Sequence, residues 1–363
     1  MATVRNTIAV AGFNPTPSIQ RSVAMTIDVA PSVPTGVSCV GVPVGVDGAV
    51  PSQLGLDRAT LVASGFDGQV GQTLVLPRPD GPTIVAVGIG DSATLDASRL
   101  RDAAAAFARA VGKHAHLTTT LANVASVPPA VAGQAVVEGV LLARYHYDAF
   151  KPEAASTALR ALTLVVAAER SAAVTQGAER GRILAAAAKL ARDLANTPPA
   201  YLTATRMAEV AEALAADRGL GIEVFDKEAL LQLGCGGLLG VNAGSVEPPR
   251  MIKLTYRPKG SSGGAGTAAG HLIMAGKGIT YDSGGINLKP GDSMHGLMNM
   301  DMSGAAAVLA AMSALAGESV VGSRGARVGV GRHTRDGMGE GPYAPIPGKE
   351  RRGHDERSDR RRV

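Results

Sequence analysis

The sequence has few of the features that nucleic-acid or membrane binding requires. It contains no tryptophan, and aromatic residues make up only 3% of its 363 residues. Because single-stranded nucleic acids are held by stacking bases on aromatic side chains, this scarcity argues against a nucleic-acid partner. No uninterrupted apolar stretch reaches the roughly 18 residues that span a bilayer, so we expect no membrane partner. Two cysteines, Cys39 and Cys235, are too few for a disulfide framework.

The N-terminus also lacks a basic stretch followed by a long apolar run, so we expect no signal peptide and a cytoplasmic location. The net charge of +5 is concentrated at the other end of the chain. Residues 318–363 hold 11 basic and 7 acidic side chains, and the rest of the chain is nearly neutral. A neutral body gives no reason to propose a nucleic-acid partner. We expect this tail to be disordered, with a basic interaction tail as the alternative.

Apolar runs and helical spacings alternate along the chain, which predicts an α/β fold. Thr83–Val87 is a continuous apolar run closed by glycines, as in a strand buried on both faces. A later helical stripe stops at Asn196-Thr197-Pro198-Pro199, because a proline pair cannot continue a helix. We therefore expect an N-terminal α/β domain over 1–165, a linker helix over 166–195, an incomplete second α/β domain with a mixed sheet flanked by helices over 196–316, and a disordered tail over 317–363.

Two lysines and two carboxylates gather in one glycine-rich stretch of the second domain. Lys277 and Asp282 follow an apolar strand, Lys289 comes next, and Asp301 lies just before the last helix. Ligand sites in open α/β sheets lie at the carboxyl ends of strands, which is where this stretch begins. Carboxylates are natural ligands of divalent cations, and a lysine ligates only as a neutral amine. A second, charged lysine could stabilise a developing oxyanion.

The segments GKGITYDSGGINLKP and MDMSGAAAVL resemble the signature region of the leucine aminopeptidase (cytosol aminopeptidase) family. The segment DLANTPPAYLT, at residues 193–203, is similar to the start of that family's catalytic domain. The resemblance implies that Lys277 and Asp301 bind the tighter of two metal ions and that Asp282 bridges both. It implies that Lys289 is the catalytic lysine near the scissile carbonyl. It further implies two Mn²⁺ or Zn²⁺ ions, release of N-terminal leucine and other apolar residues from peptides, and a homo-hexamer.

One departure from the family pattern changes the expected activity. The family carries a later motif of the form NTDAEGR, which supplies an Asp, a Glu and an Arg, and this sequence has no such string. The tighter site keeps Lys277, Asp282 and Asp301, whereas the other keeps only Asp282, so ligands remain for about one ion. We expect a partial catalytic metallopeptidase domain, truncated and frameshifted after about residue 317, with weak or no activity and poor solubility. The alternative is an inactive α/β remnant with a binding or scaffolding role.

Each residue of this site also has a plainer interpretation. Lys277 by itself resembles a surface lysine, Asp282 a turn former and Asp301 a helix-start acid, and only their joint spacing indicates a site. Asp282-Ser283-Gly284-Gly285 is similar to the nucleophile segment of chymotrypsin-type proteases, but those are all-β proteins, whereas helices are clear here. His295 lies between Lys289 and Asp301 and is expected only to border the site.

Overall fold

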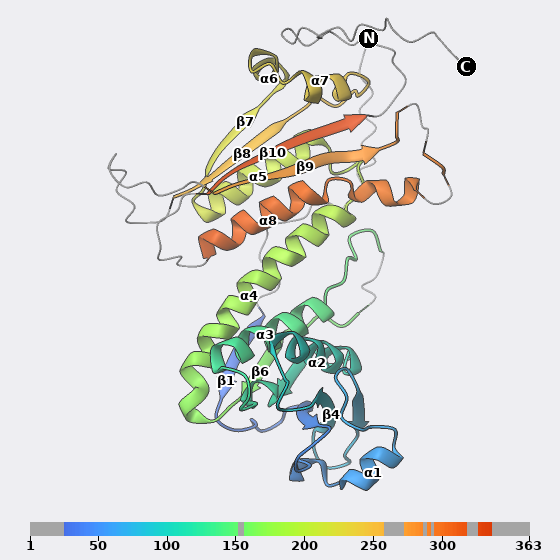
Figure 1. The fold of residues 1–363 in the computed structure, drawn as a ribbon, viewed down its shortest axis with the longest axis vertical. Helices are drawn as coiled ribbons and strands as arrows, with labels where there is room; N and C mark the ends of the chain where they lie inside the picture. Colours follow the sequence, from blue (N-terminus) through green and yellow to red (C-terminus); the bar gives the residue numbers. More distant parts are fainter. Residues whose placement is uncertain are drawn as a thin grey trace, which may run out of the picture.

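The computed structural model describes residues 25–151, 156–257, 272–285, 289–291, 294–317 and 326–335. These residues form two α/β units that share one long helix, α4 (Ala168–Asn196) (Figure 1). Each unit is built on its own sheet with helices packed against it. The predicted fold class, an α/β domain followed by a second α/β domain with a mixed sheet, is confirmed. In the described part of the chain no helix combines the length and apolarity needed to cross a membrane.

The first unit contains a six-stranded sheet in the order β1-β6-β5-β2-β4-β3. All neighbouring pairs are parallel except β3 with β4. Its strands are β1 (Thr26–Ala30), β2 (Cys39–Gly45), β3 (Thr73–Leu76), β4 (Thr83–Gly90), β5 (His116–Thr119) and β6 (Ala161–Val165). Its helices are α1 (Arg58–Ala63), α2 (Ala97–Ala110) and α3 (Pro129–Ala143), with short 3-10 turns η1 (Ser52–Leu54) and η2 (Leu121–Asn123).

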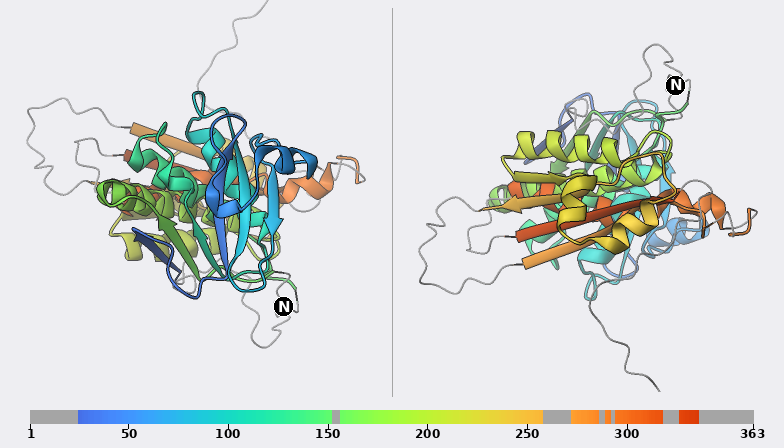
Figure 2. Two further views of the ribbon diagram at one scale, coloured as in Figure 1. Left: turned by 90° about the horizontal axis from the view of Figure 1, so that it is seen from below. Right: turned by 90° about the horizontal axis from the view of Figure 1, so that it is seen from above.

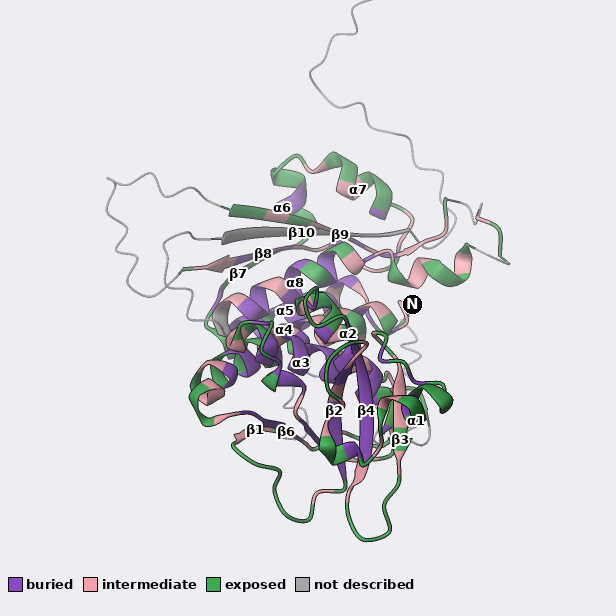
Figure 3. Ribbon diagram, turned by 60° about the horizontal axis from the view of Figure 1, so that its bottom comes forward, coloured by how far each residue is buried: buried purple, intermediate pink, exposed green. Residues whose placement is uncertain are grey.

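The strand predicted from Thr83 onwards is confirmed as β4 and is buried on both faces (Figure 3). Successive side chains of a strand point to opposite sides, so its apolar run serves two cores. Val85 and Val87 belong to the core that includes α2 and α3. Ile84 and Ala86 belong to a smaller core beneath α1. This double burial explains why the run is continuous rather than alternating.

Helix α4 ties the two units together, in the range where we expected a linker helix. Its first half lies directly against α3, because glycines allow the two backbones to approach closely. A Cβ atom on Gly177 would stand 1.8 Å from the carbonyl oxygen of Ala130, so no larger residue fits there. Its second half packs on the second unit, where Ala187 meets Ala310 and Ala314. One continuous helix therefore takes part in both cores.

The second unit contains a four-stranded mixed sheet in the order β7-β8-β10-β9. Helices α5 and α8 cover its inner face, and α6 and α7 lie across its outer face (Figure 2). The strands are β7 (Gly221–Phe225), β8 (Met251–Tyr256), β9 (Leu272–Asp282) and β10 (Ala326–Arg335). The helices are α5 (Ala204–Arg218), α6 (Lys227–Gln232), α7 (Gly236–Asn242) and α8 (Ser303–Gly317), with the 3-10 helix η3 (His295–Met300).

Strand β10 corrects one sequence-based expectation. We expected no regular structure after residue 316, yet Ala326–Arg335 lies between β8 and β9, antiparallel to the first and parallel to the second. In this place it satisfies the backbone N–H and C=O groups of both neighbours, which would otherwise form two unpaired sheet edges. Its sequence, ARVGVGRHTR, does not predict a strand, because glycine and arginine dominate and only two valines alternate. In the described chain, β9 is one edge of the sheet.

Candidate metal-binding site

A bulge in β9 places two of the predicted site residues on one side of the strand. Lys277 and Asp282 are five residues apart, a spacing that in a regular strand puts side chains on opposite faces. The pairing of β9 with β10 is irregular here, because His333 pairs with Ile279 and Arg335 pairs with Asp282. Strand β9 thus contains one extra residue at this point, which restores Lys277 and Asp282 to a common face.

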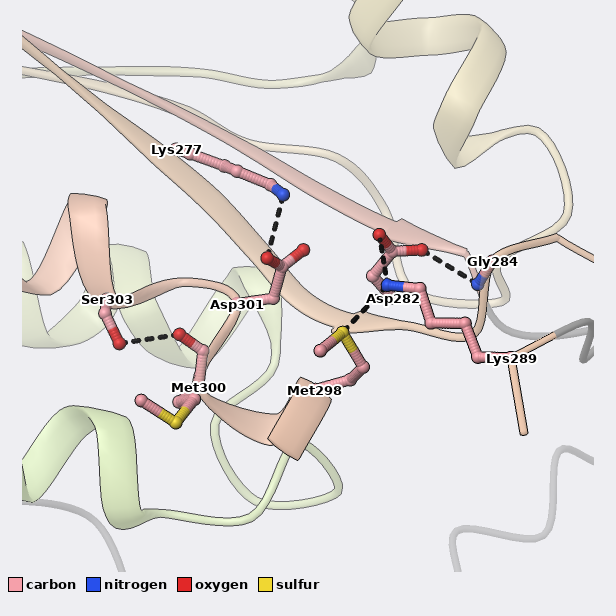
Figure 4. Close-up of polar contacts among 8 residues, drawn as sticks. All are labelled: Lys277, Asp282, Gly284, Lys289, Met298, Met300, Asp301 and Ser303. Carbon is pink, nitrogen blue, oxygen red and sulfur yellow. Dashed lines mark hydrogen bonds and ion pairs between the residues drawn. The ribbon is translucent and has the colours of Figure 1, made fainter. Parts of the chain in front are cut away.

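Asp301 approaches Lys277 from the turn between η3 and α8. Its Oδ1 accepts a hydrogen bond from Lys277 Nζ at 2.8 Å (Figure 4). The carboxylate is 18% exposed and the lysine 53%, so water solvates only one partner of this ion pair well. Asp301 Oδ2 is buried and has no hydrogen-bond partner among the described residues. This carboxylate therefore retains an unused acceptor atom in a place that water reaches poorly.

Two glycines, which the sequence analysis did not single out, bring Asp301 this close to β9. A Cβ atom on Gly276 would stand 2.4 Å from the carbonyl oxygen of Gly304. A Cβ atom on Gly304 would stand 3.0 Å from the backbone nitrogen of Lys277. Any side chain at Gly276 would push the start of α8, and Asp301 with it, away from the strand. The signal in the sequence was a glycine directly before Lys277 and another three residues after Asp301.

Asp282 is held by a second lysine. Lys289 Nζ donates to Asp282 Oδ2 at 2.9 Å, and the backbone N–H of Gly284 donates to Oδ1 at 2.9 Å (Figure 4). The hydrogen bond from Lys289 lowers the pKa of Asp282, and the Gly284 N–H and the charge of Lys277 add to this effect. Lys289 also lies 2.8 Å from Met298 Sδ. Both carboxylates of the site are therefore neutralised by lysines.

The four predicted residues thus come together in one region, as two ion pairs that face the same space (Figure 4). The described residues contain no group of three His, Cys, Asp or Glu side chains suited to a metal ion. The available donor set is two carboxylates and the amine of Lys277. This set fits one hard or borderline divalent cation, because carboxylate oxygens are its preferred ligands and Asp301 Oδ2 is unused. Lys277 would have to lose its proton to join it.

His295 has a more defined position than its sequence suggested. Its Nδ1 forms a hydrogen bond with the hydroxyl of Tyr281, and the two ring centroids are 5.7 Å apart. Tyr281, a residue that the sequence analysis passed over, directly precedes Asp282 in the bulged part of β9. The pair therefore links the strand to η3 beside the site.

Comparison with known proteins gives matches over both units. Two family models match, described as the cytosol aminopeptidase family N-terminal domain over residues 55–154 and the catalytic domain over residues 189–322. The probable cytosol aminopeptidase of Streptomyces avermitilis is 40% identical over 289 residues, which cover 75% of this chain and 53% of that protein. Its counterpart in Streptomyces coelicolor is 39% identical over 327 residues, covering 82% and 59%. The chain thus spans little more than half the length of these relatives.

Solved structures give matches of the same kind, over most of this chain and about two thirds or less of theirs. The bottromycin maturation enzyme BotP in complex with Mn is 34% identical, with a TM-score of 0.69 over 82% of this chain and 60% of that chain. A mutant of tomato leucine aminopeptidase is 21% identical, with a TM-score of 0.73 over 90% of this chain and 66% of that chain. The second likeness shows the fold only.

Proposed function

Because the chain belongs to the cytosol aminopeptidase family, we propose that Lys277, Asp282 and Asp301 hold a divalent metal ion in a metal-dependent aminopeptidase site. The observation that carries this proposal is the buried Oδ2 of Asp301, which has no hydrogen-bond partner among the described residues, in a site that also contains the Asp282 carboxylate and the Lys277 amine. A buried carboxylate oxygen without a partner costs folding free energy, and a cation would remove that cost. The manganese complex of BotP supports Mn²⁺ as the ion to test first.

The two lysines have different roles in this proposal. Lys277 is 53% exposed and bonds only one oxygen of Asp301 among the described groups, so it can release its proton to water and ligate as an amine. Lys289 is 20% exposed and is held between Asp282 and Met298. We assign it to remain charged and to donate to the oxyanion that develops on the scissile carbonyl. A bound divalent ion would supply Lewis-acid polarisation of that carbonyl and a lower pKa for the attacking water.

The finer parts of the proposal come from the family. They are peptide substrates with N-terminal leucine or another apolar residue, a pair of Mn²⁺ or Zn²⁺ ions in complete members, a homo-hexamer and a cytoplasmic location. For this chain we propose ligands for about one ion. Of the ligands assigned above, only Asp282 would also serve a second ion, and the described residues offer no cluster of three acidic, histidine or cysteine side chains.

A ligand set for about one ion also favours a second candidate function, a one-metal protein that binds peptides without cleaving them. Calorimetric titration with Mn²⁺ and hydrolysis of leucine p-nitroanilide, with and without a chelator, separate the two candidates. Stoichiometric Mn²⁺ binding with chelator-sensitive hydrolysis supports the aminopeptidase. Binding of one ion without hydrolysis supports the second candidate. If Mn²⁺ does not bind, or if Asp301→Asn binds it as tightly as the wild type, the proposed site is wrong.

A further inference from the structure

We propose that Tyr281 and His295 are positioning residues that fix the separation of Asp282 and Asp301 and thereby set the metal affinity of the site. The inference rests on the proposed function, because it concerns the same ligands. It assigns a role to a hydrogen bond between two residues that bind no ion themselves.

The position of this contact in the chain is the first reason. Tyr281 lies in the bulge of β9 and immediately precedes Asp282, whereas His295 is the first residue of η3, which ends next to Asp301. The bond between the Tyr281 hydroxyl and His295 Nδ1 therefore joins the two segments that carry the carboxylates. Lys289 lies between Tyr281 and His295 in the sequence. The bond therefore holds the two ends of this loop together and restricts the distance between them.

The surroundings of His295 are the second reason. Its Nε2 is buried and has no hydrogen-bond partner in the part of the chain that the structure describes. A histidine that served only as a solvated surface residue would keep this nitrogen in water. The ring is instead oriented by the Tyr281 bond and by a tilted contact between the two rings, at an interplanar angle of 45°. Burying Nε2 without a partner costs free energy, which indicates that the contact with Tyr281 holds the ring in this orientation.

The third reason is how Asp301 and η3 are held in the structure. In the structure described here, its Oδ1 is held by Lys277. That ion pair joins two residues that would both contact the ion, so it does not by itself fix the separation of Asp301 from Asp282. Among the described residues, the side chains that tie η3 to other segments include the Tyr281 bond, the contact of Lys289 Nζ with Met298 Sδ at 2.8 Å, and a 3.5 Å hydrogen bond from Asn299 to the carbonyl oxygen of Ala195. The Tyr281 bond is the one of these that joins η3 directly to β9, and the thioether sulfur of Met298 is only a weak acceptor.

Four variants of the full chain test the inference, with Mn²⁺ affinity measured by calorimetry and the thermal midpoint measured in chelator. Tyr281→Phe removes one oxygen, and His295→Phe removes both ring nitrogens while keeping a ring. We expect each to weaken Mn²⁺ binding about tenfold, the low end for residues that support metal ligands. The double variant should be no weaker than either single variant, because both remove the same bond. His295→Asn keeps a polar atom near the Nδ1 position and should restore most of the affinity.

Tyr256→Phe is the matched control, since Tyr256 packs against the second core rather than the site. It should leave Mn²⁺ affinity unchanged. Equal affinities of wild type and Tyr281→Phe, additive losses in the double variant, or an Asn variant as weak as the Phe variant would each overturn the inference while leaving the proposed function intact. If the wild-type chain binds no Mn²⁺, both the inference and the proposed function are wrong. A lower thermal midpoint with unchanged affinity would reduce the pair to a structural contact.

Discussion

Replacement of Asp301 by asparagine should make the metal-free protein more stable while removing its metal binding. The wild-type carboxylate has one oxygen buried without a partner among the described residues, and an unsatisfied buried group of this kind costs about 1–3 kcal/mol. The ion pair that the variant loses involves a lysine that is 53% exposed, and such pairs contribute about 0–1 kcal/mol. A neutral amide still accepts from Lys277 and costs less to bury. We expect a net gain of about 1 kcal/mol in the free energy of unfolding.

Urea unfolding in chelator and in Mn²⁺ tests this reasoning. At a Mn²⁺ concentration of 100 times its Kd, the ion should stabilise the wild type by about 2.7 kcal/mol and the variant by almost nothing. The order of stability should therefore reverse between the two conditions. Asp28→Asn, on an exposed position of β1, is the matched control and should behave as the wild type in both. The reasoning fails if Asp301→Asn is clearly less stable than the wild type in chelator, or if it keeps the Mn²⁺ increment.

Three further outcomes are expected. Gly276→Ala should lower the free energy of unfolding by about 3 kcal/mol, because its Cβ would meet the Gly304 backbone at 2.4 Å, whereas Gly304→Ala should cost about 1 kcal/mol or less; urea unfolding ranks the two. Burial raises the pKa of Asp193 above its ordinary value of 3.8. The buried, ionised carboxylate therefore lowers the free energy of unfolding at neutral pH, and this cost disappears when the pH falls below 3.8. Asp193→Asn, which still accepts from Tyr145, should be more stable than wild type at pH 7 and lose this advantage as the pH falls toward that value, as pH-dependent unfolding would show. Ile273→Lys, on the edge strand at a position 67% exposed, should slow aggregation in light scattering without changing Mn²⁺ affinity; unchanged aggregation would show that this edge is not the cause.

Local patterns were sufficient for most of the fold. The apolar run at Thr83–Val87, closed by glycines, indicated β4, because a strand between two cores is apolar on both faces. The proline pair after Asn196 marked the end of α4, because proline has no N–H for the helix. The stretch 326–335 was missed because its glycines and arginines carry little strand preference. It becomes a strand through backbone pairing with β8 and β9, which no local pattern records.

The sequence by itself determined which residue types are available for chemistry: two lysines and two carboxylates in one glycine-rich stretch, and too few aromatic residues for base stacking. The tertiary structure decided how they meet. A single extra residue in β9 turns Asp282 to the face of Lys277, and two glycines let the start of α8 bring Asp301 against them. Bulges and close backbone approaches depend on the partner segment, so the contact of Tyr281 with His295 and the buried oxygen of Asp301 could not be derived from spacing along the chain.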